Sequence, residues 1–415
     1  MSQGEDYKSA STEPTIDDVR TATIALAGIT YHTPLHESGY LNDVLGSRVF
    51  LKLENLQRTG SFKLRGAYNR IRQLTSPELK AGVVAASAGN HAQGVALAAG
   101  LVGTTAVVVM PKGASLTKIE ATRGYGAEVH LVGDTFDEAF EHAQTLAKDT
   151  GRVLIHAFDD ASIIAGQGTI GLELLDERST LDLLIVPVGG GGLISGIALA
   201  AKARNPRVKV VGVQAQGANA MVQSRFSGSV VTTTAVHTIA DGIAVKRPGA
   251  LTFGMIERYV DELVTVNEHD ISRAILFFLE RSKLVVEGAG AVALAALLSG
   301  KVLPGNRTVA ALVSGGNIDV SLLSRIIEKG LVEEGRQLHV RTAVGDRPGQ
   351  LLKLLDQIAR LEANVIRIEH ERWQPHLSPA DVAVNLVLET RNGDHIARVV
   401  QALTQEGYQV SIDKE

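Results

Sequence analysis

The stretch LDLLIVPVGGGGLISGIALAAKAR, residues 181–204, carries the signals from which the fold follows. Residues Leu183–Val188 are apolar at consecutive positions, which is typical of a parallel strand covered on both faces. The four glycines of residues 189–192 come next, and the pattern of Leu193–Ala203 predicts a helix. A strand that passes through a tight turn into a helix is the repeating unit of a doubly wound α/β sheet.

The same alternation extends along the chain on both sides of this stretch. Short β-branched runs predict further strands at Gly82–Ser87, Ala106–Met110, Glu128–Val132, Val208–Gln214, Glu262–Val266 and Thr308–Val313. Helical spacing predicts helices between them at Ala114–Arg123, Thr135–Lys148 and His269–Arg281. Parallel sheets with right-handed crossovers are therefore expected.

The composition bounds the domain count and the partners. A chain of 415 residues exceeds the size at which one hydrophobic core stops growing, so two or three domains are expected. A formal net charge of −4 gives no reason to expect nucleic acid or an anionic membrane as a partner. The chain has no cysteine, which excludes disulfides, thiolate catalysis and cysteine-based metal sites. Small-molecule substrates are the better expectation.

The N-terminal region predicts no targeting signal. Residues 1–14 are polar and carry acids where a signal peptide needs basic residues and then an apolar run, so they are expected to form a loose tail. The apolar region Val95–Met110 is broken by glycines and threonines at 100 and 103–105, which predicts a helix, a turn and a strand instead of a membrane span. A cytoplasmic protein is expected.

The pattern changes near residues 333–336, a polar segment without periodicity that is expected to be a linker. After it come a strand (Leu338–Val344), a helix (Gln350–Leu361), two strands (Val365–His370 and Val382–Leu388), a helix (Asp394–Gln405) and a strand (Tyr408–Ile412). This order, βαββαβ, predicts a ferredoxin-like domain over residues 336–415. The main domain is expected to span 15–332, with a smaller subdomain at about 50–157.

A lysine at 63 is the first candidate for chemistry, within Ser61-Phe62-Lys63-Leu64-Arg65-Gly66. Ser61 is a good helix N-cap, which places Lys63 in the first helical turn. The positive end of the helix macrodipole would lower the pKa of an amine there and favour its use as a nucleophile. On spacing alone, an ordinary surface lysine explains the motif as well.

Three turns at strand ends are candidates for binding. Ser87-Ala88-Gly89-Asn90-His91 leads from a strand into a helix, and suits either a carboxylate or a plain turn with a capping asparagine. The run Gly189, Gly190, Gly191 and Gly192 lets backbone N–H groups surround an anion, most simply a phosphate. Ser314 follows the strand Thr308–Val313, and without other context it is best interpreted as a cap of the next helix.

Taken in order, these four motifs resemble the threonine/serine dehydratase family. The resemblance runs from about Thr15 to Gly330 and implies a fold-type II pyridoxal-phosphate enzyme, similar to the tryptophan synthase β chain, with two doubly wound subdomains. The tail, with Asp346-Arg347-Pro348-Gly349, looks like an ACT regulatory domain. An ACT domain implies an amino-acid effector near Pro348 and Gly349 in a homo-oligomer.

The resemblance also implies roles for single residues. Lys63 would bind pyridoxal 5′-phosphate covalently and act as the base. The N–H groups of Gly189–Gly192 and of Leu193 would hold the cofactor phosphate. Asn90 would bind the ring hydroxyl, and Ser314 would face the pyridine nitrogen. The substrate carboxylate would lie on the loop Ser87, Ala88, Gly89, Asn90 and His91.

Together they predict threonine dehydration with release of ammonia, with L-serine as a second substrate. Serine racemases are similar but carry a serine as second base, where this chain has Ala88; they also carry an acidic metal cluster, whereas no acid lies between Gly212 and Ser224. No divalent metal is therefore expected. A catalytically silent amino-acid sensor is a further alternative, and an NAD enzyme would need a ribose-binding acid that is not found in register.

Overall fold

The computed structural model describes residues 12–372 and 377–412. The chain forms two compact units that divide between Asp319 and Val320. The first unit holds two sheets and the second holds one. The expected boundary near residues 332–336 is therefore too late, because helix α14 (Val320–Glu333) groups with the second unit. Most of the expected tail lies outside the described residues.

The larger sheet of the first unit has the order β1-β2-β10-β7-β8-β9, in which only β1 runs antiparallel. Its strands are β1 Leu35–Glu37, β2 Val49–Leu53, β10 Val309–Val313, β7 Leu183–Pro187, β8 Lys209–Ala215 and β9 Glu262–Val266. Strands β2, β7 and β10 are buried at every residue, as expected for parallel strands covered on both faces.

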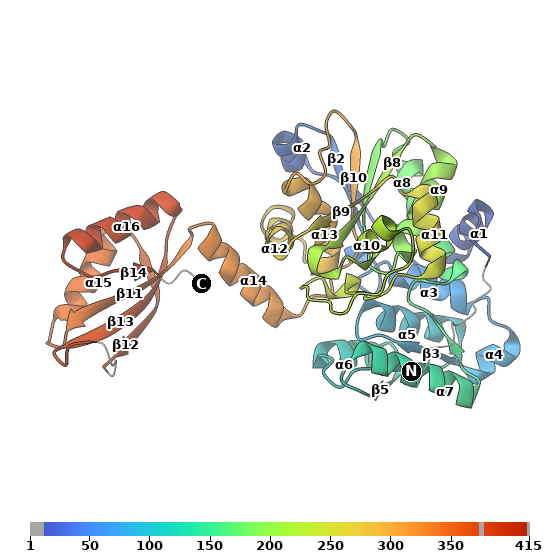
Figure 1. Ribbon diagram of the computed structural model, residues 1–415, viewed down its shortest axis with the longest axis horizontal. Helices are drawn as coiled ribbons and strands as arrows, with labels where there is room; N and C mark the ends of the chain where they lie inside the picture. Colours follow the sequence, from blue (N-terminus) through green and yellow to red (C-terminus); the bar gives the residue numbers. More distant parts are fainter. Residues whose placement is uncertain (1–11, 373–376, 413–415) are drawn as a thin grey trace. The chain divides into compact units, whose positions relative to one another are not determined.

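Helices cover both faces of this sheet (Figure 1). Helices α8 (Ala161–Glu177), α9 (Gly192–Arg204) and α11 (Ala250–Tyr259) pack on one face and share an apolar core with the strands. Helix α13 (Gly288–Leu298) packs on strands of the sheet and against α12 (Glu268–Phe277). The remaining helices of this part are α1 Ile16–Leu26, α2 Gly39–Leu45 and α10 Ala220–Ser227.

The smaller sheet is wholly parallel and has the order β5-β4-β3-β6. Its strands are β5 Glu128–Leu131, β4 Ala106–Met110, β3 Val83–Ala86 and β6 Val153–Leu154. Alternate residues of β3 and β4 face two separate cores, one shared with α3 (Lys63–Ile71) and α5 (Asn90–Val102) and one with α7 (Phe136–Thr150). Two further helices are α4 Ser76–Ala81 and α6 Leu116–Gly124.

The C-terminal unit confirms the βαββαβ order. Its elements are β11 Gln337–Gly345, α15 Gln350–Arg360, β12 Asn364–Glu371, β13 Asp381–Glu389, α16 Gly393–Gln405 and β14 Ser411–Ile412. The sheet order is β12-β13-β11-β14, with every neighbouring pair antiparallel. The two helices share an apolar core with the sheet. This is the ferredoxin-like plan.

Strand β2 pairs with β10 in the larger sheet, so residues up to Leu53 belong to that sheet. The helix expected at His269–Arg281 is present, but at Phe278 it changes from an α-helix into a π-helical turn, Phe278–Ser282, which ends at Lys283 with a φ of 58°.

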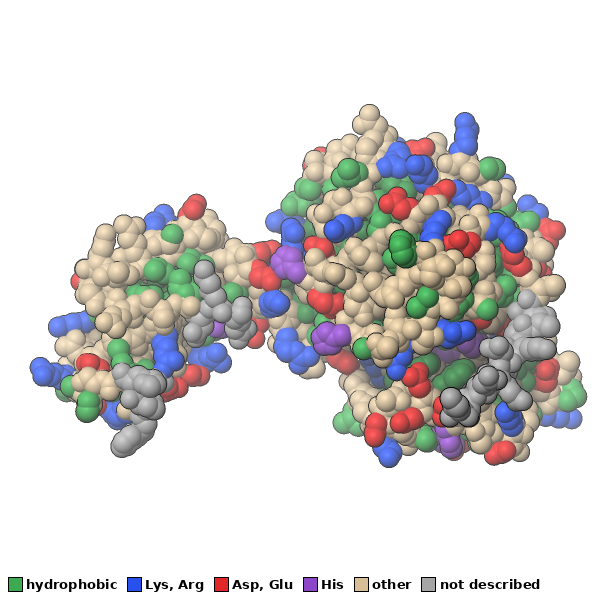
Figure 2. Space-filling view, viewed as in Figure 1, with side chains coloured by type: hydrophobic (Ala, Val, Ile, Leu, Met, Phe, Trp, Pro, Cys, Tyr) green, Lys and Arg blue, Asp and Glu red, His purple; other side chains and the backbone are tan. Residues whose placement is uncertain are grey.

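The region Val95–Met110 is the predicted helix, turn and strand. No helix among the described residues is long and apolar enough to cross a bilayer. On the face of the molecule shown in Figure 2, basic and acidic side chains are interspersed. This mixture agrees with the small net charge of the chain.

Candidate active site

The four motifs lie at the carboxyl ends of the parallel strands. The loops after β3, β7 and β10 begin at Ser87, Val188 and Ser314, and the start of α3 lies beside them. Direct bonds join these segments: the Phe62 N–H donates to the Ser314 carbonyl at 3.2 Å. Carboxyl ends of parallel strands are where doubly wound folds bind their ligands.

Lys63 is the first residue of α3 and is half-buried. Its Nζ donates to the Ala157 carbonyl at 3.0 Å. Burial lowers the pKa of this amine to about 8, against an opposing effect of Glu287. A larger share of the amine is therefore unprotonated at neutral pH, as a nucleophile requires. The placement in the first helical turn is confirmed, but burial is the main cause of the lowered pKa.

The N-cap predicted at Ser61 is wrong. Phe62 occupies the cap position of α3 and makes no side-chain cap bond. The Ser61 hydroxyl is buried without a partner among the described residues, while its backbone forms a bridge with Gly315. The approach to Lys63 is thus set by backbone pairing to the loop after β10, a long-range contact that local patterns do not reveal.

The glycine turn of residues 189–192 leads into α9, and one side of it is closely packed against other parts of the chain. Gly191 has a φ of +100°, which favours glycine. A Cβ on Gly190 would lie 2.4 Å from atoms of the Phe158 ring, and one on Gly192 would lie 2.7 Å from the Phe158 carbonyl oxygen. The Thr252 hydroxyl donates to the Gly190 carbonyl at 2.6 Å. With this side filled, the first-turn N–H groups of the helix are the natural anion site.

The loop after β3 places its side chains in different directions. The Ser87 hydroxyl accepts from the Gly89 N–H at 3.2 Å. Asn90 is not the helix cap, since Gly89 takes that position. The His91 Nε2 lies 2.9 Å from the Ile155 carbonyl and so donates to it. Burial first, and then the charge of Lys63, lower the pKa of His91 to about 3, so this imidazole is neutral.

Ser314 lies at the end of β10 and is 2% exposed. Its hydroxyl donates to the Ala289 carbonyl at 3.3 Å. The next helix begins only at Val320, so Ser314 is not a helix cap. It stays a candidate for contact with a bound ligand.

Glu287 belongs to the same cluster and was missed in the sequence. It precedes α13 and is 4% exposed. Its Oε1 accepts from Asn90 Nδ2 at 2.6 Å. Burial, and then the charge of Asp241, raise its pKa to about 8. A single glutamate before a Gly- and Ala-rich helix follows no motif, and a charge at the head of an otherwise apolar segment was the only available signal.

Lys118 links the two subdomains at the edge of the cluster. This residue of α6 forms ion pairs with Asp241 and, at 3.8 Å, with Asp319. The Ser115 hydroxyl also donates to Asp319, at 3.0 Å. Burial acts to lower the pKa of Lys118, but the two aspartates outweigh it and the pKa is raised.

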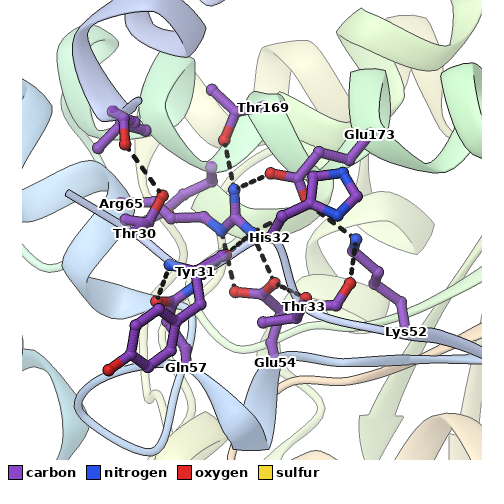
Figure 3. A network of polar contacts seen from close by, with 12 residues as sticks. Thr30, Tyr31, His32, Thr33, Lys52, Glu54, Gln57, Arg65, Thr169 and Glu173 are labelled. Carbon is purple, nitrogen blue, oxygen red and sulfur yellow. Dashed lines mark hydrogen bonds and ion pairs between the residues drawn. The ribbon is translucent and has the colours of Figure 1, made fainter. Parts of the chain in front are cut away.

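A buried ion network surrounds Arg65, which lies two residues after Lys63 on α3 (Figure 3). Arg65 is 1% exposed and binds Glu54, itself fully buried, through Nε at 2.9 Å and Nη2 at 2.7 Å. It also donates to Glu173 at 2.5 Å. Lys52 extends the network through Glu173 at 2.8 Å and Glu177 at 3.1 Å. The network ties the helix of Lys63 to β2 and α8.

The chain belongs to the family of pyridoxal-phosphate-dependent enzymes, whose sequence model matches residues 27–315. The resemblance to threonine/serine dehydratases is confirmed by individual relatives. The L-threonine ammonia-lyase of Thermotoga maritima is 49% identical over 398 residues, 96% of this chain and 99% of the relative. The catabolic L-threonine dehydratase TdcB of Escherichia coli K12 is 47% identical over 313 residues, 75% of this chain and 95% of the relative.

Solved structures support the fold assignment. Maize serine racemase is similar with a TM-score of 0.73 at 36% identity, covering 78% of this chain and all of that one. The first unit is therefore a fold-type II pyridoxal-phosphate enzyme.

Proposed function

We propose that this chain is a threonine ammonia-lyase that converts L-threonine into 2-oxobutanoate and ammonia and also accepts L-serine. The observation that carries the proposal is the place of the half-buried Lys63: its Nζ donates to the Ala157 carbonyl, and the next residue, Phe158, packs against Gly190 and Gly192 of the glycine turn. The similarity to L-threonine ammonia-lyase over 96% of the chain supports this substrate.

The donor set of the site fits pyridoxal 5′-phosphate. The cofactor supplies, when bound, an aldehyde that reacts with amines and a pyridine ring that withdraws electrons from the substrate Cα. We infer that Lys63 binds the aldehyde and that N–H groups of Gly189–Gly192 and of Leu193 bind the phosphate. An N–H of Asn90 would bind the ring hydroxyl, and Ser314 would face the ring nitrogen.

The residues of this chain then divide the work of elimination. The backbone N–H groups at the start of α5, after Ser87, hold the substrate carboxylate. The Lys63 amine would take the proton from Cα. The neutral hydroxyl of Ser314 would stabilise a protonated ring nitrogen poorly, so negative charge would not be stored for long. The favoured outcome is departure of the β-hydroxyl as water, with the proton that Lys63 has taken up, while the electron pair of the Cα–H bond forms a Cα–Cβ double bond.

Serine racemisation is the second candidate, because maize serine racemase shares the fold at 36% identity. Racemisation needs a second proton-transferring group on the face opposite Lys63. Ala88 carries no such group, and the His91 imidazole is committed to the Ile155 carbonyl. We therefore favour elimination.

One assay decides between these functions. The purified protein is incubated separately with L-threonine, L-serine and D-serine, and ammonia, 2-oxo acids and the stereochemistry of the remaining serine are measured. We expect the wild-type protein to form 2-oxobutanoate from L-threonine. The Lys63→Ala variant should be inactive, and borohydride should not attach the cofactor to it. D-serine formed from L-serine would support racemisation. A wild-type protein that binds the cofactor but releases no ammonia would indicate a silent sensor.

We further propose that the C-terminal unit is an ACT domain that binds an amino-acid effector near Pro348 and Gly349 in a homo-oligomer. Both residues are exposed and precede α15, and Gly349 has a φ of +88°. The Escherichia coli relative aligns over 95% of its length with only 75% of this chain, which suggests that this unit is an addition to the catalytic part. Activity of the full chain, titrated with each amino acid in turn, should respond to at least one. A Pro348→Ala variant should weaken that response, and a chain indifferent to all of them would refute the proposal.

A further inference from the structure

The amide of Asn90 is held in one orientation by a chain of hydrogen bonds. Asn317 Nδ2 lies 2.8 Å from the Thr59 carbonyl, which can only accept, so this atom must be the nitrogen. The same Nδ2 lies 2.7 Å from Asn90 Oδ1, which must therefore be the oxygen. Asn90 Nδ2 then donates to Glu287 Oε1 at 2.6 Å. The direction of all three hydrogen bonds therefore follows from the Thr59 carbonyl, which can only accept.

Counting the N–H groups shows which donor these hydrogen bonds leave unused. An amide nitrogen has two N–H groups. Asn317 uses both, toward Thr59 and Asn90. Within the described residues, Asn90 donates one N–H to Glu287 and keeps one for another acceptor. A rotated Asn90 would place two nitrogens, both of which donate, together at Asn317.

Gly315 makes room for the Glu287 carboxyl, because a Cβ on Gly315 would lie 2.2 Å from Glu287 Oε1. Although Glu287 stands at the cap position of α13, its side chain makes no cap bond there. The carboxyl is thus built into the loop after β10 and directed at Asn90.

Charged groups surround this carboxyl from several elements. Asp241 lies in the turn Asp241–Ile243, Lys118 on α6 and Lys63 on α3. Burial and Asp241 raise the pKa of Glu287 to about 8, against the Asn90 hydrogen bond and the two lysines. At neutral pH the carboxyl is mostly neutral, so glutamine is a close mimic of it.

We propose that Glu287 is a positioning residue, which holds the Asn90 amide so that its remaining N–H is available to the ring hydroxyl of the cofactor. This inference rests on the proposed cofactor site. It adds a residue that touches neither substrate nor cofactor but orients one that does.

The test measures cofactor binding directly. Full-length protein is stripped of cofactor, titrated with pyridoxal phosphate, and followed by absorbance, with thermal unfolding of the stripped protein as the fold control. We expect Glu287→Ala to lower the affinity by roughly 10- to 100-fold and to shift the absorption maximum. Glu287→Gln, which keeps the acceptor oxygen, should recover the affinity to within about threefold of wild type.

A control variant removes an exposed but hydrogen-bonded carboxylate at the amino ends of the strands of the larger sheet. Asp261 binds Lys202 at 2.8 Å and the Val210 N–H at 2.7 Å, near the amino ends of β8 and β9. Asp261→Ala should leave affinity and absorption maximum near wild type.

Three outcomes overturn the inference: Glu287→Ala that binds as wild type does, Glu287→Gln that binds as poorly as alanine, or a folded Glu287→Asp that binds normally despite its shorter reach. If the alanine variant fails to fold, the glutamine and aspartate variants decide. A wild-type protein that binds no cofactor would instead refute the proposed function.

Discussion

Arg65 offers the sharpest test of how the position of Lys63 is maintained. Its guanidinium is 1% exposed and binds the fully buried Glu54 through two bonds, at 2.7 and 2.9 Å. Replacing it with methionine keeps the bulk but leaves Glu54 with the Thr33 hydroxyl as its remaining partner in this network. Removing one partner of a buried ion pair costs about 3–5 kcal/mol, so a loss of that size in unfolding free energy is expected.

The measurement is urea unfolding followed by circular dichroism. Because the chain has two compact units, the unfolding curve can contain two transitions. The transition that belongs to the first unit is the one that pyridoxal phosphate shifts to higher urea. Glu54→Gln and the double variant complete a thermodynamic cycle. The double variant should be less destabilised than Arg65→Met alone, since it no longer buries an unpaired charge.

An exposed pair provides the control. Arg20 and Asp17 are 2.8 Å apart, with side chains 65% and 81% exposed. Arg20→Met should leave the unfolding midpoint where it is, because exposed ion pairs contribute little. If Arg65→Met moved the midpoint no more than Arg20→Met does, or if the double variant were the least stable of all, the reasoning about buried charge would be refuted.

Three further predictions concern the site. Since burial lowers the pKa of Lys63 to about 8, the rate at which the stripped protein reacts with pyridoxal phosphate should rise with pH and level off above about 8; stopped-flow absorbance that still rose steeply at pH 10 would contradict this. His91 has a folded-state pKa of about 3, below its ordinary 6.5, so its contribution to stability is complete above pH 6.5 and is lost as the pH falls toward 3. The unfolding free energy of His91→Gln should therefore fall less steeply than that of wild type over this range, and equal slopes would count against a neutral buried imidazole. Gly190→Ala would push a Cβ against the Phe158 ring, so cofactor affinity should drop at least about tenfold and Phe158→Ala should restore part of it, both measured by absorbance titration.

Much of the doubly wound part was predictable from local pattern. Strands such as β4 and β7 are covered on both faces, and consecutive apolar residues report that burial directly. The glycine turn and the start of α3 could also be recognised in the sequence, because each has unusual residues at fixed positions. The roles assigned to these residues stay predictions until the cofactor and its contacts are observed.

What the pattern missed depends on distant partners. The strand Val49–Leu53 looks the same whichever sheet it joins, and only its pairing with β10 places it in the larger sheet. Ser61 has the composition of a helix cap, but pairing with Gly315 claims its backbone. Glu287 becomes meaningful only beside Asn90, which lies 197 positions earlier in the chain.

The packing around α3 explains why several glycines are also needed outside the glycine turn of residues 189–192. A Cβ on Gly94 of α5 would lie 3.1 Å from the Lys63 carbonyl carbon, and one on Gly166 of α8 would lie 2.6 Å from the Arg65 carbonyl oxygen. A Cβ on Gly66 would in turn lie 2.8 Å from the Ile163 carbonyl oxygen. The helix that carries Lys63 is thus held by backbone on two sides, and its amine inherits that rigidity. Because interiors transmit strain, a methyl group added at Gly166 would displace the amine by moving α3, whereas one added at Gly94 would press on Lys63 directly.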